Sequence, residues 1–187
     1  AVLSPSAERK LGENFMQQAR RHLPIIDDPE LAYYLQTLGL RLVAHSERPD
    51  LDFRFFLVRD GSINAFAVPG GFIGVHTGLL LNARNEGEVA SVLAHEIAHV
   101  TQRHLPRLIA QSQRTTLPAM AAMLAGLLLA RSGQGGEATI AITTAALGQQ
   151  QLNYTREYEQ EADRLGMKIL TGSGFDARAM PSFFDRL

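Results

Sequence analysis

The first part of the chain repeats its apolar residues with the period of an α-helix. Apolar side chains recur every four positions in residues 6–22, as at Leu11 and Phe15, and this spacing predicts a first amphipathic helix. A second stretch opens with Asp28, a typical helix cap, and with Pro29 at the first helical position. Leucines follow on one face, so we expect a second amphipathic helix there.

After residue 50 the spacing of apolar residues is no longer that of a helix and becomes typical of β-strands. Three runs rich in aromatic and branched residues are separated by turn signals, Asp60-Gly61 and Pro69-Gly70-Gly71. The runs cover residues 51–58, 62–68 and 72–76. Short strands joined by tight turns predict a three-stranded antiparallel meander, and we expect a short helix at 78–82 to follow it.

Helical spacing returns in residues 88–105, EVASVLAHEIAHVTQRHL. Asn85 suits the N-cap, and acidic residues at the start of the segment suit the positive end of the helix dipole. Pro106 is expected to end this helix near Leu105. The whole pattern predicts a mainly helical α+β fold, with residues 1–187 as one domain and the small sheet beside this helix.

The last third of the chain contains a long apolar region. Residues 117–130 are almost wholly apolar, a glycine-rich break follows, and residues 137–148 are again rich in Ala, Ile and Thr. A buried helical hairpin is the simpler interpretation. A lid, or a surface that touches lipid or unfolded substrate, is the other. Residues 153–171 then predict a charged helix, and Asp176 can cap a last one.

Composition excludes several classes of protein. With 187 residues, 45% of them hydrophobic, the chain can bury one core. A net charge of −1 argues against a nucleic-acid surface. Because cysteine is absent, a zinc site would have to use histidine and carboxylate ligands. No apolar run reaches the roughly 18 residues of a membrane span, and the missing initiator Met is what we expect of a processed secreted protein or an excised piece.

The segment HEIAH at residues 95–99 has the spacing of a zinc peptidase motif. An α-helix turns by about 100° per residue, so His95 and His99 lie one turn apart on one face. Both imidazoles can then reach one metal ion, with Glu96 beside them as a general base. The alternative is a buried helix whose histidines only pack or form hydrogen bonds.

A catalytic zinc needs a third protein ligand, and the acidic cluster at residues 157–163 is its candidate source. Glu159 and Asp163 share a helix face, whereas Glu161 is expected to point elsewhere. We therefore expect Glu159 to bind zinc and Asp163 to accept the free ring N–H of a ligand histidine. An ordinary acidic helix face is the alternative.

Two further histidines are interpreted as structural. His104 follows His95 by nine residues, which is about 180° around the same predicted helix. We therefore expect His104 on the opposite face, where the helix dipole favours it or it forms structural hydrogen bonds. His76 lies in a predicted strand and is not needed when two histidines and a glutamate already supply the ligands.

Together these residues resemble the HtpX and CAAX-prenyl-protease family of zinc metallopeptidases, which are gluzincins. HEIAH at 95–99 and EQEADR at 159–164 match its HExxH and ExxAD signatures. NAF at 64–66, PGG at 69–71 and GLL at 78–80 stand where that family carries similar elements. The resemblance covers nearly the whole chain and is most marked for periplasmic members whose peptidase domain precedes tetratricopeptide repeats.

The resemblance implies a zinc-dependent metalloendopeptidase that binds one Zn²⁺ per chain and uses Glu96 as general base. A strand at Asn64, Ala65 and Phe66 would bind an extended substrate segment through main-chain hydrogen bonds. The donor to the tetrahedral oxyanion is left open among Arg164, Tyr158 and His76.

Two functions from different classes follow from these features. The first is a protease for unfolded or misassembled envelope proteins in the bacterial periplasm, near the outer-membrane assembly machinery. The second is a periplasmic chaperone or assembly factor for outer-membrane proteins, with a structural or latent zinc site. Glu96 favours the first, because a structural site has no use for a general base. Neither involves nucleic acid, and peripheral membrane contact is an open possibility for residues 117–148.

Overall fold

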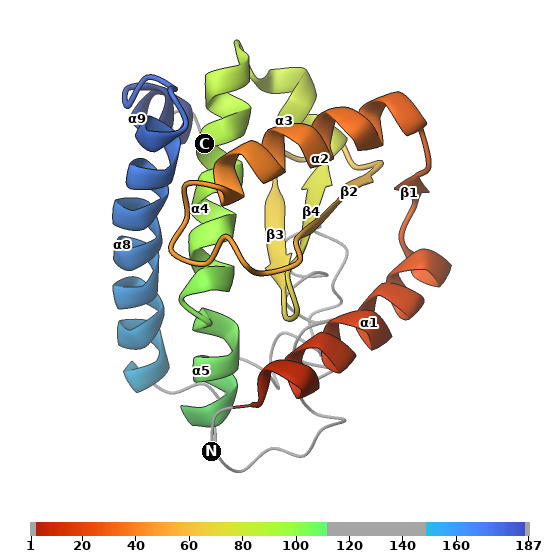
Figure 1. The fold of residues 1–187 in the computed structure, drawn as a ribbon, viewed down its shortest axis with the longest axis vertical. Helices are drawn as coiled ribbons and strands as arrows, with labels where there is room; N and C mark the ends of the chain where they lie inside the picture. The colour runs from red at the N-terminus through yellow and green to blue at the C-terminus, as the bar shows by residue number, and fades with distance from the viewer. Residues whose placement is uncertain (1–2, 112–148, 186–187) are drawn as a thin grey trace.

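The computed structural model describes residues 3–111 and 149–185 (Figure 1). Its helices are α1 (Pro5–His22), α2 (Pro29–Val43), α3 (Thr77–Asn82), α4 (Glu86–Thr101), α5 (His104–Gln111), α8 (Gln149–Gly172) and α9 (Ala179–Phe184). Its strands are β1 (Ile25–Ile26), β2 (Arg54–Val58), β3 (Ala65–Val68) and β4 (Phe72–His76). The mainly helical α+β fold is therefore confirmed. Residues 117–148 lie outside the described residues, so both interpretations of that region stay predictions.

Helices α2 and α4 begin at the caps that the sequence indicated. The Asp28 carboxylate accepts hydrogen bonds from the backbone N–H groups of Glu30 and Leu31. Asn85 Oδ1 accepts one from the N–H of Glu88. These N–H groups have no acceptor within their own helix, so each cap stabilises the first turn.

The sheet is mixed and has four strands, in the order β1-β2-β4-β3. β2 runs parallel to β4, while β1 and β3 are antiparallel to their neighbours. The predicted three-stranded antiparallel meander was therefore wrong: it omitted β1 and made β2 the neighbour of β3. The chain after β2 instead crosses the end of β4, where Asp60 and Asn64 accept hydrogen bonds from Gly78 and His76. β3 is thereby placed at an edge.

Helices cover both faces of this sheet. Helices α2 and α4 pack on one face, where the main core contains Leu42, Ile73 and Leu93, each with no exposed surface. Helix α1 packs on the other face through Met16, which joins a smaller apolar cluster. Since side chains alternate along a strand, neighbouring residues of β3 face different helices. β4, in the middle, is buried along its whole length.

Helix α8 runs antiparallel to α4 and lies beside it (Figure 1). Gly166 permits this close approach, because a Cβ atom at that position would lie 3.1 Å from both Cα and N of His95. The packing places the acidic segment of α8 directly against the HEIAH segment of α4. Two parts of the chain that are distant in sequence thus form one site.

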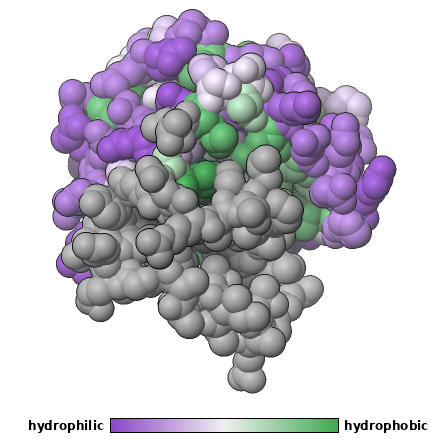
Figure 2. Space-filling view, turned by 90° about the horizontal axis from the view of Figure 1, so that it is seen from below, coloured by the Kyte–Doolittle hydropathy of each residue, from purple (hydrophilic) through white to green (hydrophobic). Residues whose placement is uncertain are grey.

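Polar residues cover most of the periphery in the view of Figure 2, whereas hydrophobic residues gather near the middle of that face. Among the residues that the structure describes, no helix combines the length and apolar character needed to cross a bilayer.

Candidate metal centre

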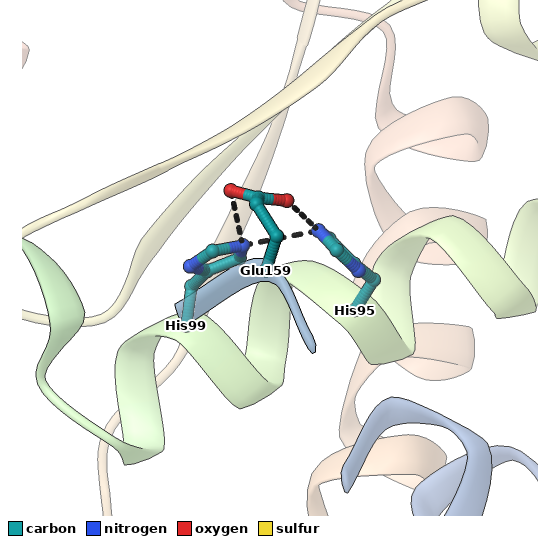
Figure 3. Close-up of side chains that lie close together, drawn as sticks. All are labelled: His95, His99 and Glu159. Atoms are coloured by element: carbon teal, nitrogen blue, oxygen red, sulfur yellow. Dashed lines mark hydrogen bonds and ion pairs between the residues drawn. The ribbon is translucent and has the colours of Figure 1, made fainter. Parts of the chain in front are cut away.

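His95, His99 and Glu159 converge between α4 and α8 (Figure 3). The Nε2 atoms of the two histidines lie 3.0 Å apart. The Glu159 carboxylate lies 3.3 Å from Nε2 of His95 and 3.5 Å from Nε2 of His99. Within residues 3–111 and 149–185, this is the one group of three or more potential ligand side chains that could hold a metal ion. It is the set that the sequence predicted.

The spacing of these atoms fits tetrahedral zinc. Bonds of about 2.0–2.1 Å to nitrogen and oxygen place neighbouring ligand atoms of a tetrahedron about 3.3 Å apart. The three separations cluster around that value. Two imidazoles and one carboxylate are also ligands that zinc accepts, and three protein ligands leave a fourth position open for a reacting molecule. The residues present therefore fit a catalytic zinc ion.

Asp163 orients the first of these ligands. Its Oδ1 lies 2.9 Å from Nδ1 of His95. An ionised carboxylate can only accept a hydrogen bond, so Nδ1 of His95 carries the proton. When His95 is neutral, its lone pair is then on Nε2, the atom that faces His99 and Glu159. This is the contact that the spacing of Glu159 and Asp163 led us to expect.

Burial and nearby charge act in opposite directions on the cluster. Burial by itself lowers the pKa of His95, but hydrogen bonds to Asp163 and Glu159 and the charge of Glu96 outweigh it and raise this pKa to about 10. Burial likewise raises the pKa of Glu159, but its contacts with His95 and His99 lower it far below the ordinary value. Without a metal, the cluster therefore holds a proton among carboxylates, in a position where a cation is favoured.

His104 does not lie on the opposite face, and that prediction was wrong. Helix α4 ends at Thr101, Arg103 adopts a φ of 55°, and α5 begins at His104. Helical phase cannot be counted across this break. Pro106 does not end α4 but lies in the first turn of α5, where proline is tolerated. As a result, Nδ1 of His104 lies 2.9 Å from Nδ1 of His99.

Two side chains of the acidic segment, Tyr158 and Glu161, do not contact the three candidate ligands but contact His104. Nε2 of His104 lies 2.8 Å from Oε2 of Glu161, and the ring of Tyr158 stacks on the His104 imidazole with centroids 4.5 Å apart and an angle of 11°. Burial lowers the pKa of His104 despite the opposing contact with Glu161. The sequence analysis missed this group because it assumed an unbroken helix.

A pocket of about 510 Å³ opens beside the cluster. Glu96, 8% exposed, lies in its wall next to the ligands, and Asn64 and Ala65 line it at the start of β3. Much of the remaining wall is apolar and includes Leu79, Val92, Met167, Met180, Phe183 and Phe184. The pocket therefore joins the candidate metal site to an apolar surface and to the edge of the sheet.

Four residues that the sequence analysis proposed for the site do not line this pocket. Phe66 packs in the apolar cluster on the α1 side of the sheet. His76 is buried, with Nδ1 2.7 Å from Oγ of Ser62. Arg164 is exposed on α8, and Tyr158 is the residue stacked on His104. Oxyanion binding by the last three stays a prediction, and Phe66 can contribute to the strand edge only through its backbone.

Comparison with known proteins agrees with the motifs and the geometry. The model of peptidase family M48 matches residues 29–186. The chain belongs to family M48. The putative beta-barrel assembly-enhancing protease of Vibrio cholerae serotype O1 is 47% identical over 100% of this chain and 39% of its own length. The beta-barrel assembly-enhancing protease of Escherichia coli strain K12 is 42% identical with the same coverage.

A more distant relative matches less of the chain. The mitochondrial metalloendopeptidase OMA1 of Schizosaccharomyces pombe is 30% identical over 82% of this chain and 43% of its own length. The chain thus spans about two fifths of the length of each of these three relatives. Family M48 is a family of metallopeptidases, and this is the class of enzyme that the HExxH and ExxAD signatures predicted.

Proposed function

We propose that this chain is the peptidase domain of a longer zinc-dependent endopeptidase of the bacterial envelope. One observation carries the proposal: His95, His99 and Glu159 converge at zinc-ligand spacing on a pocket that Glu96 also lines. Two ligands and a base could come from one helix by coincidence. The supply of the third ligand from α8, together with Asp163 on His95, is what a catalytic site requires.

The residues of the pocket divide the work of peptide hydrolysis. A zinc ion held by His95, His99 and Glu159 would supply Lewis-acid activation of a water molecule and of the scissile carbonyl. Glu96 takes a proton from the attacking water and then gives it to the leaving amine. Asp163 keeps the lone pair of His95 on Nε2 throughout.

The substrates that fit this site are unfolded or misassembled proteins. β3 is the last strand of the sheet, and among the described residues it pairs only with β4. An extended segment can add to its free edge through main-chain hydrogen bonds, with the Asn64 side chain at the pocket as a polar anchor. The apolar wall suits large apolar side chains, which folded proteins bury and unfolded ones expose.

The names of the relatives support a place in outer-membrane quality control. Two of them are called beta-barrel assembly-enhancing proteases and match the whole of this chain. We therefore propose a periplasmic protein that acts on outer-membrane proteins or on their assembly machinery. In this proposal a further domain, such as tetratricopeptide repeats, lies outside this chain.

Zinc analysis combined with cleavage of casein, an unfolded protein, tests this function. We expect one zinc per chain, cleavage of casein, and loss of cleavage after chelation that returns when zinc is added back. A chain that binds zinc, suppresses aggregation of unfolded outer-membrane protein and never cleaves it would favour the chaperone function instead. A chain that binds no zinc would contradict both the site and the mechanism.

A further inference from the structure

The two histidine ligands differ in what holds their second nitrogen. Nδ1 of His95 contacts the Asp163 carboxylate, which is an ordinary arrangement for a metal-bound histidine. Nδ1 of His99 instead lies 2.9 Å from Nδ1 of His104. A contact between two imidazole nitrogens at this distance works only if one is protonated and the other is not.

The neighbours of both rings decide which nitrogen carries the proton. Nε2 of His99 faces the other two ligands, so a metal bound at the cluster would take the lone pair of Nε2, and Nδ1 would then hold the ring proton. Nδ1 of His104 must then accept that hydrogen bond. On its other side, Nε2 of His104 lies 2.8 Å from the Glu161 carboxylate, which can only accept. The chain Glu161–His104–His99 therefore has one consistent direction of hydrogen bonding.

The ring of His104 is held on both its edge and its face. The ring is only 2% exposed. Tyr158 stacks on it almost in parallel, and the guanidinium of Arg107 lies over that tyrosine ring, 4.5 Å from its centroid. Arg107 also contacts Glu161 at 3.4 Å. These contacts fix the plane of His104, and with it the direction of its lone pair.

The backbone brings His104 to this position by an unusual turn. Arg103 adopts a positive φ, which costs energy for a residue other than glycine. Its guanidinium forms an ion pair with Glu8 in the first turn of α1 and a hydrogen bond with the carbonyl of Leu3, just before that helix. The N-terminal helix thus stabilises the break between α4 and α5 that turns His104 toward His99.

We propose that His104 is a positioning residue for the metal ligand His99, and that it serves His99 as Asp163 serves His95. Its lone pair accepts the Nδ1 proton of His99 and directs the Nε2 lone pair of His99 toward the metal. The inference rests on the proposed zinc site. It adds His104 to the residues that support the site, although counting about 100° per residue along one unbroken helix would place His104 on the opposite face.

Zinc affinity of the purified protein, measured by competition with a chelator in the absence of substrate, tests the inference. The matched variants are His104→Asn and His104→Leu, whose side chains both branch at Cγ. Oδ1 of asparagine can accept the hydrogen bond from His99, whereas leucine fills the space without an acceptor. We expect His104→Leu to weaken zinc binding by about 10- to 100-fold, and His104→Asn to recover most of that loss.

Two results would overturn the proposal: equal zinc affinity of His104→Leu and the parent, or equal weakening in both variants, which would indicate packing alone. Glu161→Ala gives the same answer if neither variant folds, since Glu161 is 31% exposed and its removal leaves the core intact. We expect weaker zinc binding in Glu161→Ala, and unchanged affinity would again overturn the role. If the parent itself binds no zinc, the proposed function fails instead.

Discussion

Oδ1 of Asp163 lies 2.9 Å from Nδ1 of His95, although 68 positions separate the two residues in the chain. The contact links α8 to α4 at the same place where Glu159 meets the two histidines. The carboxylate side chain of Asp163 is 60% exposed, so it contributes little to the core. Its role is therefore one of orientation, and it can be removed without disturbing the fold.

Replacement of Asp163 by alanine should weaken zinc binding by about 10- to 100-fold, because His95 loses the acceptor that fixes its tautomer. Thermal unfolding of the metal-free protein should change little. Zinc affinity by chelator competition measures the effect. Glu157→Ala is the matched control, since it removes another exposed carboxylate from the same helix. Equal losses in the two variants would mean that only the charge of α8 matters.

Glu159→Ala should remove most of the bound zinc, because only two protein ligands remain. Atomic absorption of the dialysed protein measures the occupancy. Glu161→Ala should retain zinc better than Glu159→Ala, since Glu161 contacts His104 and not the cluster. Full zinc occupancy in Glu159→Ala would show that the third ligand has been misassigned.

Zinc binding should strengthen as the pH rises. The pKa of His95 is raised to about 10 in the metal-free protein, so zinc must displace a proton from it at neutral pH. The apparent affinity should therefore increase by about tenfold per pH unit between about pH 7 and pH 9. Chelator competition at several pH values measures the slope, and a flat profile would contradict a proton held at His95.

The metal-free fold should respond to pH in the opposite direction. The folded state holds a proton at His95 more tightly than the unfolded state does. This proton stabilises the folded state fully at pH values below about 6.5, and the contribution is lost as the pH rises toward about 10. The unfolding temperature of the metal-free protein should therefore fall through that range. His95→Gln, which cannot take up the proton, serves as the control and should show a smaller fall.

Gly166→Val should destabilise the fold by about 1–3 kcal/mol, because added atoms would press against the backbone of His95 and the end of Met180. Since α8 would move away from α4, zinc affinity should fall as well. Urea unfolding and chelator competition measure the two effects. Gly61→Val is the comparison, because no atom lies within 4 Å of a Cβ placed there. Equal stability and equal zinc affinity of Gly166→Val and the parent would contradict the close packing of α8 on α4.

The parts of the site that follow from local helix geometry could be predicted from the sequence. His95 and His99 are one turn apart on α4, and Glu159 and Asp163 are one turn apart on α8, so each pair must share a face. The caps at Asp28 and Asn85 are equally local. The contact between the two helices is not local. Its prediction depended on the chemical argument that zinc needs a third ligand.

The strand order could not be read from the turns, because it depends on contacts far apart in sequence. One signal was present nonetheless: β4 carries apolar residues on both faces, as at Phe72 and Ile73, and such a strand belongs in the middle of a sheet. The turn at Asp60 and Gly61 looks like a hairpin but crosses the end of β4. β1 has only two residues and leaves almost no pattern.

The position of His104 depends on the break at Arg103, and nothing in the residues near Arg103 marks that break as clearly as a glycine would. The ion pair with Glu8 comes from α1, 95 positions away. A contact of that kind overrides helical phase, which explains why His104 reaches His99.

The most direct measurement is casein cleavage by Glu96→Gln at known zinc occupancy. Glutamine keeps the shape of the side chain but cannot accept the proton of the attacking water. The variant should retain one zinc per chain, as the parent does, and should lose cleavage by about 10²- to 10⁴-fold. Cleavage by the zinc-loaded variant at the rate of the parent would contradict the role of Glu96 and the mechanism built on it.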